Sequence, residues 1–148
     1  MRYLKYIIAI GLGTILSKLF IYTYAYATSN EVIDYENWDF VSYDQAANNY
    51  YVDHNSFKKK DGLLIFKELT DFSSPNEYGR SRVSWLIADC LNLKISEIMV
   101  SFYSQSGGEG EELSSQKLQK KDDLVWMDAS VSKTVGNLII SYVCNQVK

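Results

Sequence analysis

Short apolar runs alternate with turn-forming residues along most of the chain, and the apolar positions within the runs repeat with a period of two. That period is typical of half-buried β-strands. Five segments show it: residues 38–42, 49–53, 63–72, 80–90 and 94–104. The third follows an Asp-Gly pair, which commonly forms a hairpin turn. We therefore expect neighbouring segments to pair as antiparallel strands.

Polar stretches separate these strands. Residues 71–79 contain the only proline of the chain and several turn formers, so they predict a loop across the end of the sheet. Residues 104–119 are polar and glycine-rich and predict a second, mobile loop. Residues 120–127 then predict a last strand.

The apolar period changes near the C-terminus. Apolar residues at helical spacing are Val131, Val135, Leu138, Ile139 and Tyr142. They predict an amphipathic helix over residues 130–143. Ser130 or Asp128 is suited to be its N-cap, because either side chain can accept from a free backbone N–H of the first turn. Cys144 is expected at or just beyond the last turn.

The first 27 residues have the layout of a signal peptide. Arg2 and Lys5 precede an uncharged apolar run over residues 7–16, and Ala25 and Ala27 occupy the small-residue positions of a cleavage site. We expect cleavage after Ala27. The chain then divides into a signal peptide (1–27), a loose leader (28–37) and one domain (38–148).

An uncleaved membrane anchor is the alternative, since residues 7–27 are long enough to cross a bilayer of about 30 Å. Lys18 disfavours it, because a charge in mid-span costs about 2.5–3.5 kcal/mol. In either case the chain is expected to meet the membrane only through this segment.

The charge balance excludes one class of partner. The chain has 15 basic and 18 acidic residues, and three of the basic ones lie in the predicted signal peptide. The exported part is therefore more acidic than the whole chain. Binding to nucleic acid needs a net basic face, so we expect no nucleic-acid partner.

The exported part contains two cysteines, Cys90 and Cys144. Export places them in an oxidising compartment, which favours a disulfide between them. Two free buried thiols are the alternative. A metal site is disfavoured, because two cysteines and one histidine without short spacing do not make a closed tetrahedral set.

Several short motifs of this chain occur together, in order, in one family. They are Trp38 at the first strand, Tyr51-Val52-Asp53 with Ser56 and a basic cluster, residues 66–72 with Leu69 and Asp71, Ser81 or Ser84 ahead of Asp89-Cys90, Tyr103 before a glycine-bearing loop, and Trp126, Ser130 and Val143-Cys144. Through their order and spacing, residues 38–144 resemble the surface-adhesin protein E family of small exported bacterial proteins.

This resemblance implies an α+β fold: a single antiparallel sheet of about six strands with a C-terminal helix clipped by the disulfide between Cys90 and Cys144. It implies that residues 38–148 form an adhesin-E-like domain in the periplasm or at the cell surface of a bacterium. It also implies adhesion, because the founding type of the family binds host extracellular-matrix and serum proteins. Fold alone does not determine function.

The sequence predicts no catalytic, cofactor or metal site. His54 is the only histidine, and its neighbour Asp53 suggests a catalytic pair. Adjacent residues of a strand point to opposite faces, however, so we interpret His54 as a solvated residue at a turn or strand end. The disulfide would occupy both thiols. We therefore do not expect an enzyme.

Two functions remain. In the first, the protein is a non-catalytic exported binding module for a protein partner, for example a surface adhesin, with Lys58, Lys59 and Lys60 as candidate contacts for an acidic partner. These lysines can equally be a solvated charge run. In the second, a periplasmic carrier or sensor holds a small apolar molecule between helix and sheet, near Trp85 or Trp126. Aromatic residues on an uncovered sheet face can also attract a second copy, which leaves a dimer open.

Overall fold

The computed structural model describes residues 35–117 and 124–147, which belong to one compact unit. The predicted signal peptide and most of the predicted leader lie outside these residues. Eight strands form one antiparallel sheet: β1 (Trp38–Tyr43), β2 (Asn49–Asp53), β3 (Lys58–Lys60), β4 (Leu63–Asn76), β5 (Gly79–Asp89), β6 (Lys94–Tyr103), β7 (Glu112–Lys117) and β8 (Met127–Asp128). The α-helix, α2 (Val135–Gln146), follows the last strand. No helix among the described residues is long and apolar enough to cross a membrane.

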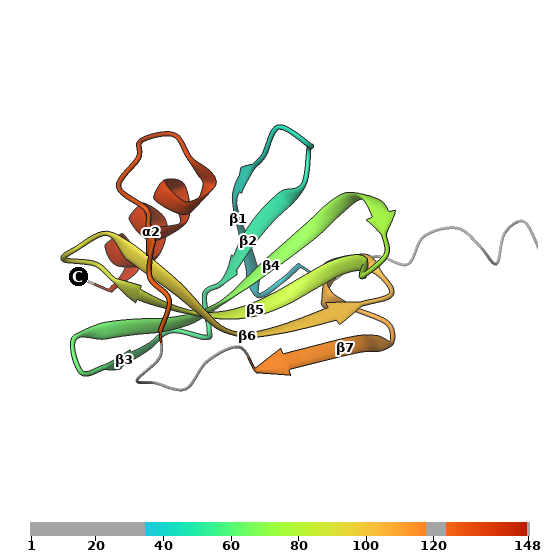
Figure 1. The fold of residues 1–148 in the computed structure, drawn as a ribbon, viewed down its shortest axis with the longest axis horizontal. Coiled ribbons are helices and arrows are strands. Elements are labelled where there is room, and N and C mark those ends of the chain that lie inside the picture. Colours follow the sequence, from blue (N-terminus) through green and yellow to red (C-terminus); the bar gives the residue numbers. More distant parts are fainter. Residues whose placement is uncertain (1–34, 118–123, 148) are drawn as a thin grey trace, which may run out of the picture. The chain divides into compact units, whose positions relative to one another are not determined.

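The sheet has a six-strand path with a short extra strand on each side. The order along the path is β1-β2-β4-β5-β6-β7, while β3 pairs with the first residues of β4 and β8 with the first residues of β6. The ends of the sheet therefore have different neighbours: β3 and β8 flank one end, and β1, β2 and β7 the other. Figure 1 shows α2 at the end that carries β3. The predicted α+β fold with about six strands is confirmed.

The main core lies between this end of the sheet and α2. Its fully or nearly buried side chains are Val52, Leu64, Phe66, Leu86, Ala88, Ile95, Ala129, Ile139, Ile140 and Val143. Those of the strands come from alternate positions, as the period of two requires, and Ile139, Ile140 and Val143 come from α2. Each of the larger ones stabilises the fold by about 1.5–3 kcal/mol through burial. The helix is thereby fixed to one face of the sheet.

The helix starts later than predicted. Thr134 is the N-cap, and its side chain accepts from the backbone N–H of Asn137 at 3.2 Å. The backbone before it bends, since Lys133 has a φ of 66°. Val131 and Leu138, which the predicted apolar stripe included, are exposed, whereas Ile140 is buried. Val135, Ile139 and Tyr142 of the predicted stripe do lie in or against the core, whereas Val131 precedes the helix, which begins about one turn after residue 130.

The predicted loops are shorter than expected. β4 continues to Asn76 and β5 starts at Gly79, so only a two-residue turn separates them. Residues 112–117, assigned to the long polar loop, form β7 against β6. All six residues are exposed. Because this edge strand has no buried face, its sequence shows no alternation of apolar and polar residues, and it was not predicted. The predicted last strand is reduced to the pair Met127–Asp128, and part of it lies outside the described residues.

The shortened loop packs on the sheet face away from α2. It contains a single 3₁₀ turn, η1 (Ser106–Gly108). The backbone N–H of Gly107 donates to Asp71 Oδ1 at 2.7 Å, and that of Gly108 donates to Ser81 Oγ at 3.0 Å. Leu69 beneath the loop is fully buried. The loop thereby covers the end of this face that lies away from β3.

The two cysteines form the predicted disulfide. Cys90 follows β5, Cys144 lies in the last turn of α2, and their Cα atoms are 5.8 Å apart. The bond therefore ties the end of the helix to the end of a central strand.

Candidate functional site

The three predicted contact lysines do not act as one group, because they lie on successive positions of strand β3. Lys58 and Lys60 pair with Ile65 and Leu63 of β4 and share the sheet face away from α2. Lys59 points to the other face, where its ammonium donates to the carbonyl of Val147 at the C-terminal end of α2. A cation there interacts favourably with the helix dipole. Only Lys58 and Lys60 are thus available to a partner on the outer face.

Lys58 and Lys60 border a groove of about 470 Å³ on this outer face. The groove is lined by Leu63, Ile65, Trp85, Ile87, Ile98, Met99 and Leu124, together with Lys58, Lys60, Asp61 and Lys117. Its floor crosses β4, β5 and β6 and is almost entirely apolar. Its volume is typical of small-ligand and side-chain pockets, and an apolar area of this kind is a common mark of an interaction site.

Cations surround the tryptophan at the centre of the groove. The ammonium of Lys58 lies 5.5 Å from the Trp85 ring centroid, and that of Lys67 lies 5.1 Å away. Both distances are within the range of a cation–π interaction. Lys67 also makes an ion pair with Asp53 at 3.8 Å. The ammonium groups of both lysines thus lie over the ring of Trp85 and bring positive charge to the centre of the groove.

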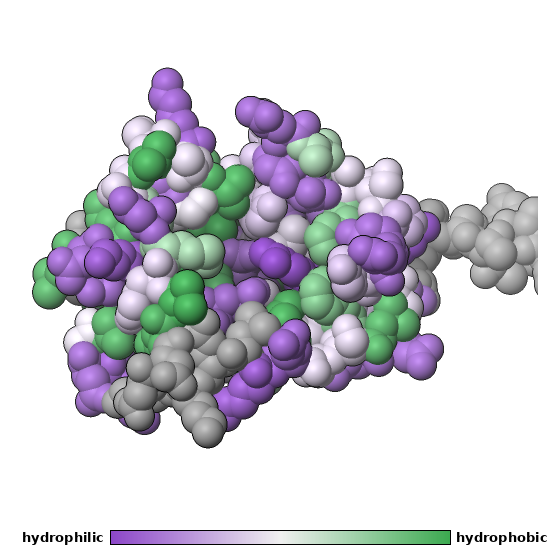
Figure 2. All heavy atoms as spheres, viewed as in Figure 1, coloured by the Kyte–Doolittle hydropathy of each residue, from purple (hydrophilic) through white to green (hydrophobic). Residues whose placement is uncertain are grey.

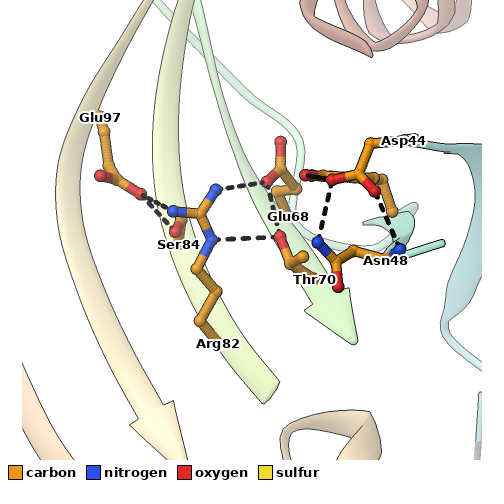
Figure 3. A network of polar contacts seen from close by, with 8 residues as sticks. Asp44, Asn48, Glu68, Thr70, Arg82, Ser84 and Glu97 are labelled. Atoms are coloured by element: carbon orange, nitrogen blue, oxygen red, sulfur yellow. Dashed lines mark hydrogen bonds and ion pairs between the residues drawn. The ribbon is translucent and has the colours of Figure 1, made fainter. Parts of the chain in front are cut away.

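The face toward α2 carries a different arrangement, a polar cleft of about 500 Å³ beside the helix. Figure 3 shows Arg82 of β5 pointing between Glu68 of β4 and Glu97 of β6. Its Nη2 lies 3.5 Å from Glu68 Oε1, its Nη1 lies 3.9 Å from Glu97 Oε1, and its Nε donates to Thr70 Oγ1 at 3.1 Å. Ser84 Oγ also donates to Glu97. One guanidinium thus connects the three central strands.

Burial dominates the electrostatics of this cleft. Glu68 is only 5% exposed, and this desolvation raises its pKa although the nearby Arg82 acts in the opposite direction. Tyr50 lines the same cleft and donates to Asp44 Oδ2 at 2.9 Å. Burial and this hydrogen bond to Asp44 raise the pKa of Tyr50 to about 12. Asp44 in turn accepts from Asn48, the second contact group of Figure 3. The cleft thus combines a network of paired polar groups with apolar side chains, among them Val131, Val135 and Ile139.

His54 has a partner that sequence reasoning missed. Its Nδ1 lies 3.2 Å from Asp39 Oδ2 on β1, and Tyr142 of α2 donates to the same carboxylate. Asp53 instead accepts from the backbone N–H of Asn55 at 2.8 Å. His54 and Asp39 are about two-fifths exposed, and the hydrogen bond from Tyr142 to Asp39 joins α2 to β1. No nucleophile or substrate pocket adjoins it among the described residues. The same residues contain no group of three or more His, Cys, Asp or Glu side chains able to hold a metal ion.

Trp85 lies on a different face from the one assigned to it by the carrier hypothesis. That hypothesis places an apolar ligand between helix and sheet, near Trp85. The contact region there is filled by Phe66, Ile140 and Val143, which are completely buried, and Trp85 faces the groove on the other side. Figure 2 shows hydrophilic and hydrophobic residues interspersed over the visible face of the domain, without one large hydrophobic area. The groove is therefore the better candidate site.

Sequence comparison places residues 38–145 in the family model described as Surface-adhesin protein E. Comparison with curated proteins gives no match. Among solved structures, crystal form II of Haemophilus influenzae protein E is 18% identical, with a TM-score of 0.53, covering 74% of this chain and 90% of that one. A further structure of Haemophilus influenzae protein E is 17% identical, with a TM-score of 0.51 and coverage of 72% and 83%. At these identities the structural likeness shows a shared fold.

Proposed function

The chain belongs to the surface-adhesin protein E family, and from this premise we propose that it is an exported, non-catalytic module that binds a protein partner in the bacterial envelope or outside the cell. The family description supports a surface location and an adhesive role. Adhesion to a host protein is the more specific form of the proposal.

The observation that carries the proposal is the groove opposite the helix. The apolar floor of the groove crosses three strands and is half-buried, with Ile87 only 6% exposed, and a partly accessible apolar centre of this kind is common in sites of protein association. The lysines at its border contrast with the acidic balance of the whole chain. Binding sites combine an apolar centre with a polar rim in this way.

The described side chains support a non-catalytic role. Both cysteines are in the disulfide, His54 pairs with an exposed carboxylate, and the buried charges of the polar cleft are paired with each other. Perturbed pKa values can mark an active site, but paired structural networks perturb them too. These groups do not form a nucleophile with an adjacent base, which is one of the arrangements that enzymes use.

Export through a cleaved signal peptide, with residues 28–148 as the mature protein, is part of the proposal. The test is to express the full chain in a bacterial host, fractionate the cells and determine the N-terminus by mass spectrometry. We expect a mature chain that starts at residue 28 and contains the disulfide. A chain that retains Met1 and stays in the inner membrane would contradict export by cleavage and would support the anchor.

Binding is tested with the exported, oxidised protein. The protein is immobilised on a biosensor surface and exposed to purified extracellular-matrix proteins, serum proteins and bacterial envelope fractions. We expect saturable, reversible binding to at least one protein, and no such binding by a reduced and unfolded sample. Absence of any saturable partner would contradict the proposed function.

The carrier for a small apolar ligand is not favoured. Its site would be the contact between helix and sheet, where the core is closely packed and the adjoining cleft has a charged floor. An apolar ligand against Glu68 and Arg82 would displace water from these charged groups and offer no hydrogen bond in return, which costs free energy.

A further inference from the structure

We propose that the groove binds an extended segment of the partner protein in which acidic side chains flank large apolar ones, an inference that rests on the protein-binding function proposed above. Here the lysine-bordered groove means the surface lined by Lys58, Lys60, Lys117 and the apolar residues around Trp85.

The floor of the groove determines the apolar part of the segment. Leu63 and Ile65 of β4, Trp85 and Ile87 of β5, and Met99 of β6 offer a surface with few polar atoms. Apolar side chains that cover this surface would remove both surfaces from water. Methionine and tryptophan also adapt to different side-chain shapes and are enriched in protein interfaces. A purely polar segment would gain little here.

The border of the groove determines the acidic part. Lys58 and Lys60 stand on one side, and Lys117 lies at the end of β7 on the other. Lys67 also lies close to Trp85, but its ion pair with Asp53 means that it adds no net charge to the border. Asp61 is the acidic residue among the groove-lining side chains. The net positive border of this site attracts carboxylates and repels a basic segment, which gives charge complementarity with an acidic partner.

The edge of the sheet favours an extended conformation. Within the described residues β3 pairs only with β4, so its outer backbone edge has no strand partner. All three residues of β3 are exposed lysines, which disfavour pairing with the same edge of a second copy. An acidic strand would neutralise these charges and add backbone hydrogen bonds along the edge. The lysines thereby select the partner by charge.

The test uses the exported, oxidised protein and a synthetic probe. The probe is a fluorescein-labelled twelve-residue peptide in which Glu alternates with Leu and a central Trp. One control peptide has Lys in place of every Glu, and the other has Ser in place of every Leu and Trp. We expect the probe to increase in fluorescence anisotropy with saturation, and both controls to bind at least about tenfold more weakly.

A pair of protein variants locates the site. In Lys58→Glu/Lys60→Glu the border charge is reversed, whereas Arg80→Glu/Lys94→Glu makes the same change in net charge at exposed positions outside the groove. We expect the first variant to weaken probe binding about tenfold at low salt, and the second about threefold or less. A circular-dichroism melt of each variant verifies that it is folded.

The outcomes separate this inference from the proposed function. Equal binding of the acidic and basic peptides, or an equal loss of probe affinity in both variants, would overturn the inference. The proposed function would still stand if the biosensor had identified a protein partner. Specific probe binding without any protein partner would support the groove chemistry and contradict the function. A second copy in the groove would appear as a concentration-dependent dimer that excludes the probe, and would also overturn the inference.

Discussion

At the scale of single residues, the guanidinium of Arg82 is the group whose environment is most clearly defined. It lies between the carboxylates of Glu68 and Glu97 on the neighbouring strands, and one of these is almost completely buried. A buried ion pair contributes little net stability, yet removing one partner is costly because it leaves the other charge unpaired in a poorly solvated place.

The substitution Arg82→Met is therefore expected to lower the free energy of unfolding by about 2–3 kcal/mol at pH 7.5. Burial raises the pKa of Glu68, so the folded state binds a proton more readily than the unfolded state. The stability that this group contributes is present below its unfolded pKa and is lost as the pH rises through its folded pKa. The loss caused by Arg82→Met should consequently shrink toward pH 4.5, because the raised pKa of Glu68 increases its protonated fraction as the pH falls.

Urea denaturation at the two pH values measures this difference. Arg80→Met, an exposed arginine of the same strand, is the matched control and should change stability by about 0.5 kcal/mol or less at either pH. An equal loss for Arg82→Met at pH 4.5 and pH 7.5 would show that Glu68 does not need this cation.

At the scale of elements, the loop between β6 and β7 packs on the sheet face that α2 leaves uncovered. Gly108 has a φ of 75°, and a Cβ atom there would lie 2.8 Å from Cγ2 of Val83. Gly62, in the turn between β3 and β4, has a φ of 78° but no atom within 4 Å of the same position. The two glycines thus share the backbone strain of a substitution and differ in the space around them.

Gly62→Ala should cost about 1 kcal/mol of stability, because a side chain is strained at positive φ. Gly108→Ala should cost at least about twice as much, because the loop must also move away from Val83 and weaken the backbone hydrogen bonds to Asp71 and Ser81. Thermal unfolding of both variants measures the difference. An equal loss of stability in the two variants would contradict this expectation and show that the loop moves away from Val83 without a cost in free energy.

The disulfide joins two elements that the chain order keeps apart. Cys90 and Cys144 are 54 positions apart, and a cross-link over a loop of this length removes about 4 kcal/mol of chain entropy from the unfolded state on the loop-closure model. Cys90→Ala/Cys144→Ala should lower the free energy of unfolding by roughly that amount, and hydrogen exchange should become faster first in the last turn of α2. Uniformly faster exchange with no early loss at the helix end would contradict a local clip.

At the scale of the whole molecule, the sheet gives its two faces different environments. One face holds the helix, the main core and the paired charges of the cleft, while the other holds the loop at one end and the lysine-bordered groove at the other. The paired charges of the cleft link the central strands, and the groove is the surface that we propose for a partner.

Periodicity predicted most of this architecture from the sequence. The strands around Leu64 and Leu86 and the disulfide were predictable because alternation and export each leave a local signal. β7 was not predictable, because an exposed edge strand has no buried face to create alternation. The start of α2 was predicted about one turn too early, because Thr134, rather than Ser130 or Asp128, caps it.

The candidate site was predicted only in part. The lysines of β3 were identified as a charge run, but their division between two faces follows from strand pairing that the sequence does not specify. The link between Arg82 and its two glutamates joins three strands, and His54 pairs with a carboxylate fifteen positions away. No local pattern indicates contacts of this kind.

The central claim is that the lysine-bordered groove is the binding surface, and an NMR titration of the ¹⁵N-labelled, oxidised protein with the acidic, apolar probe peptide tests it most directly. The account predicts chemical-shift changes at the backbone amides of Lys58 and Lys60 and at the indole N–H of Trp85, with little change at Arg82. Shifts centred on Arg82 and the polar cleft, or no shifts at saturating peptide, would contradict it.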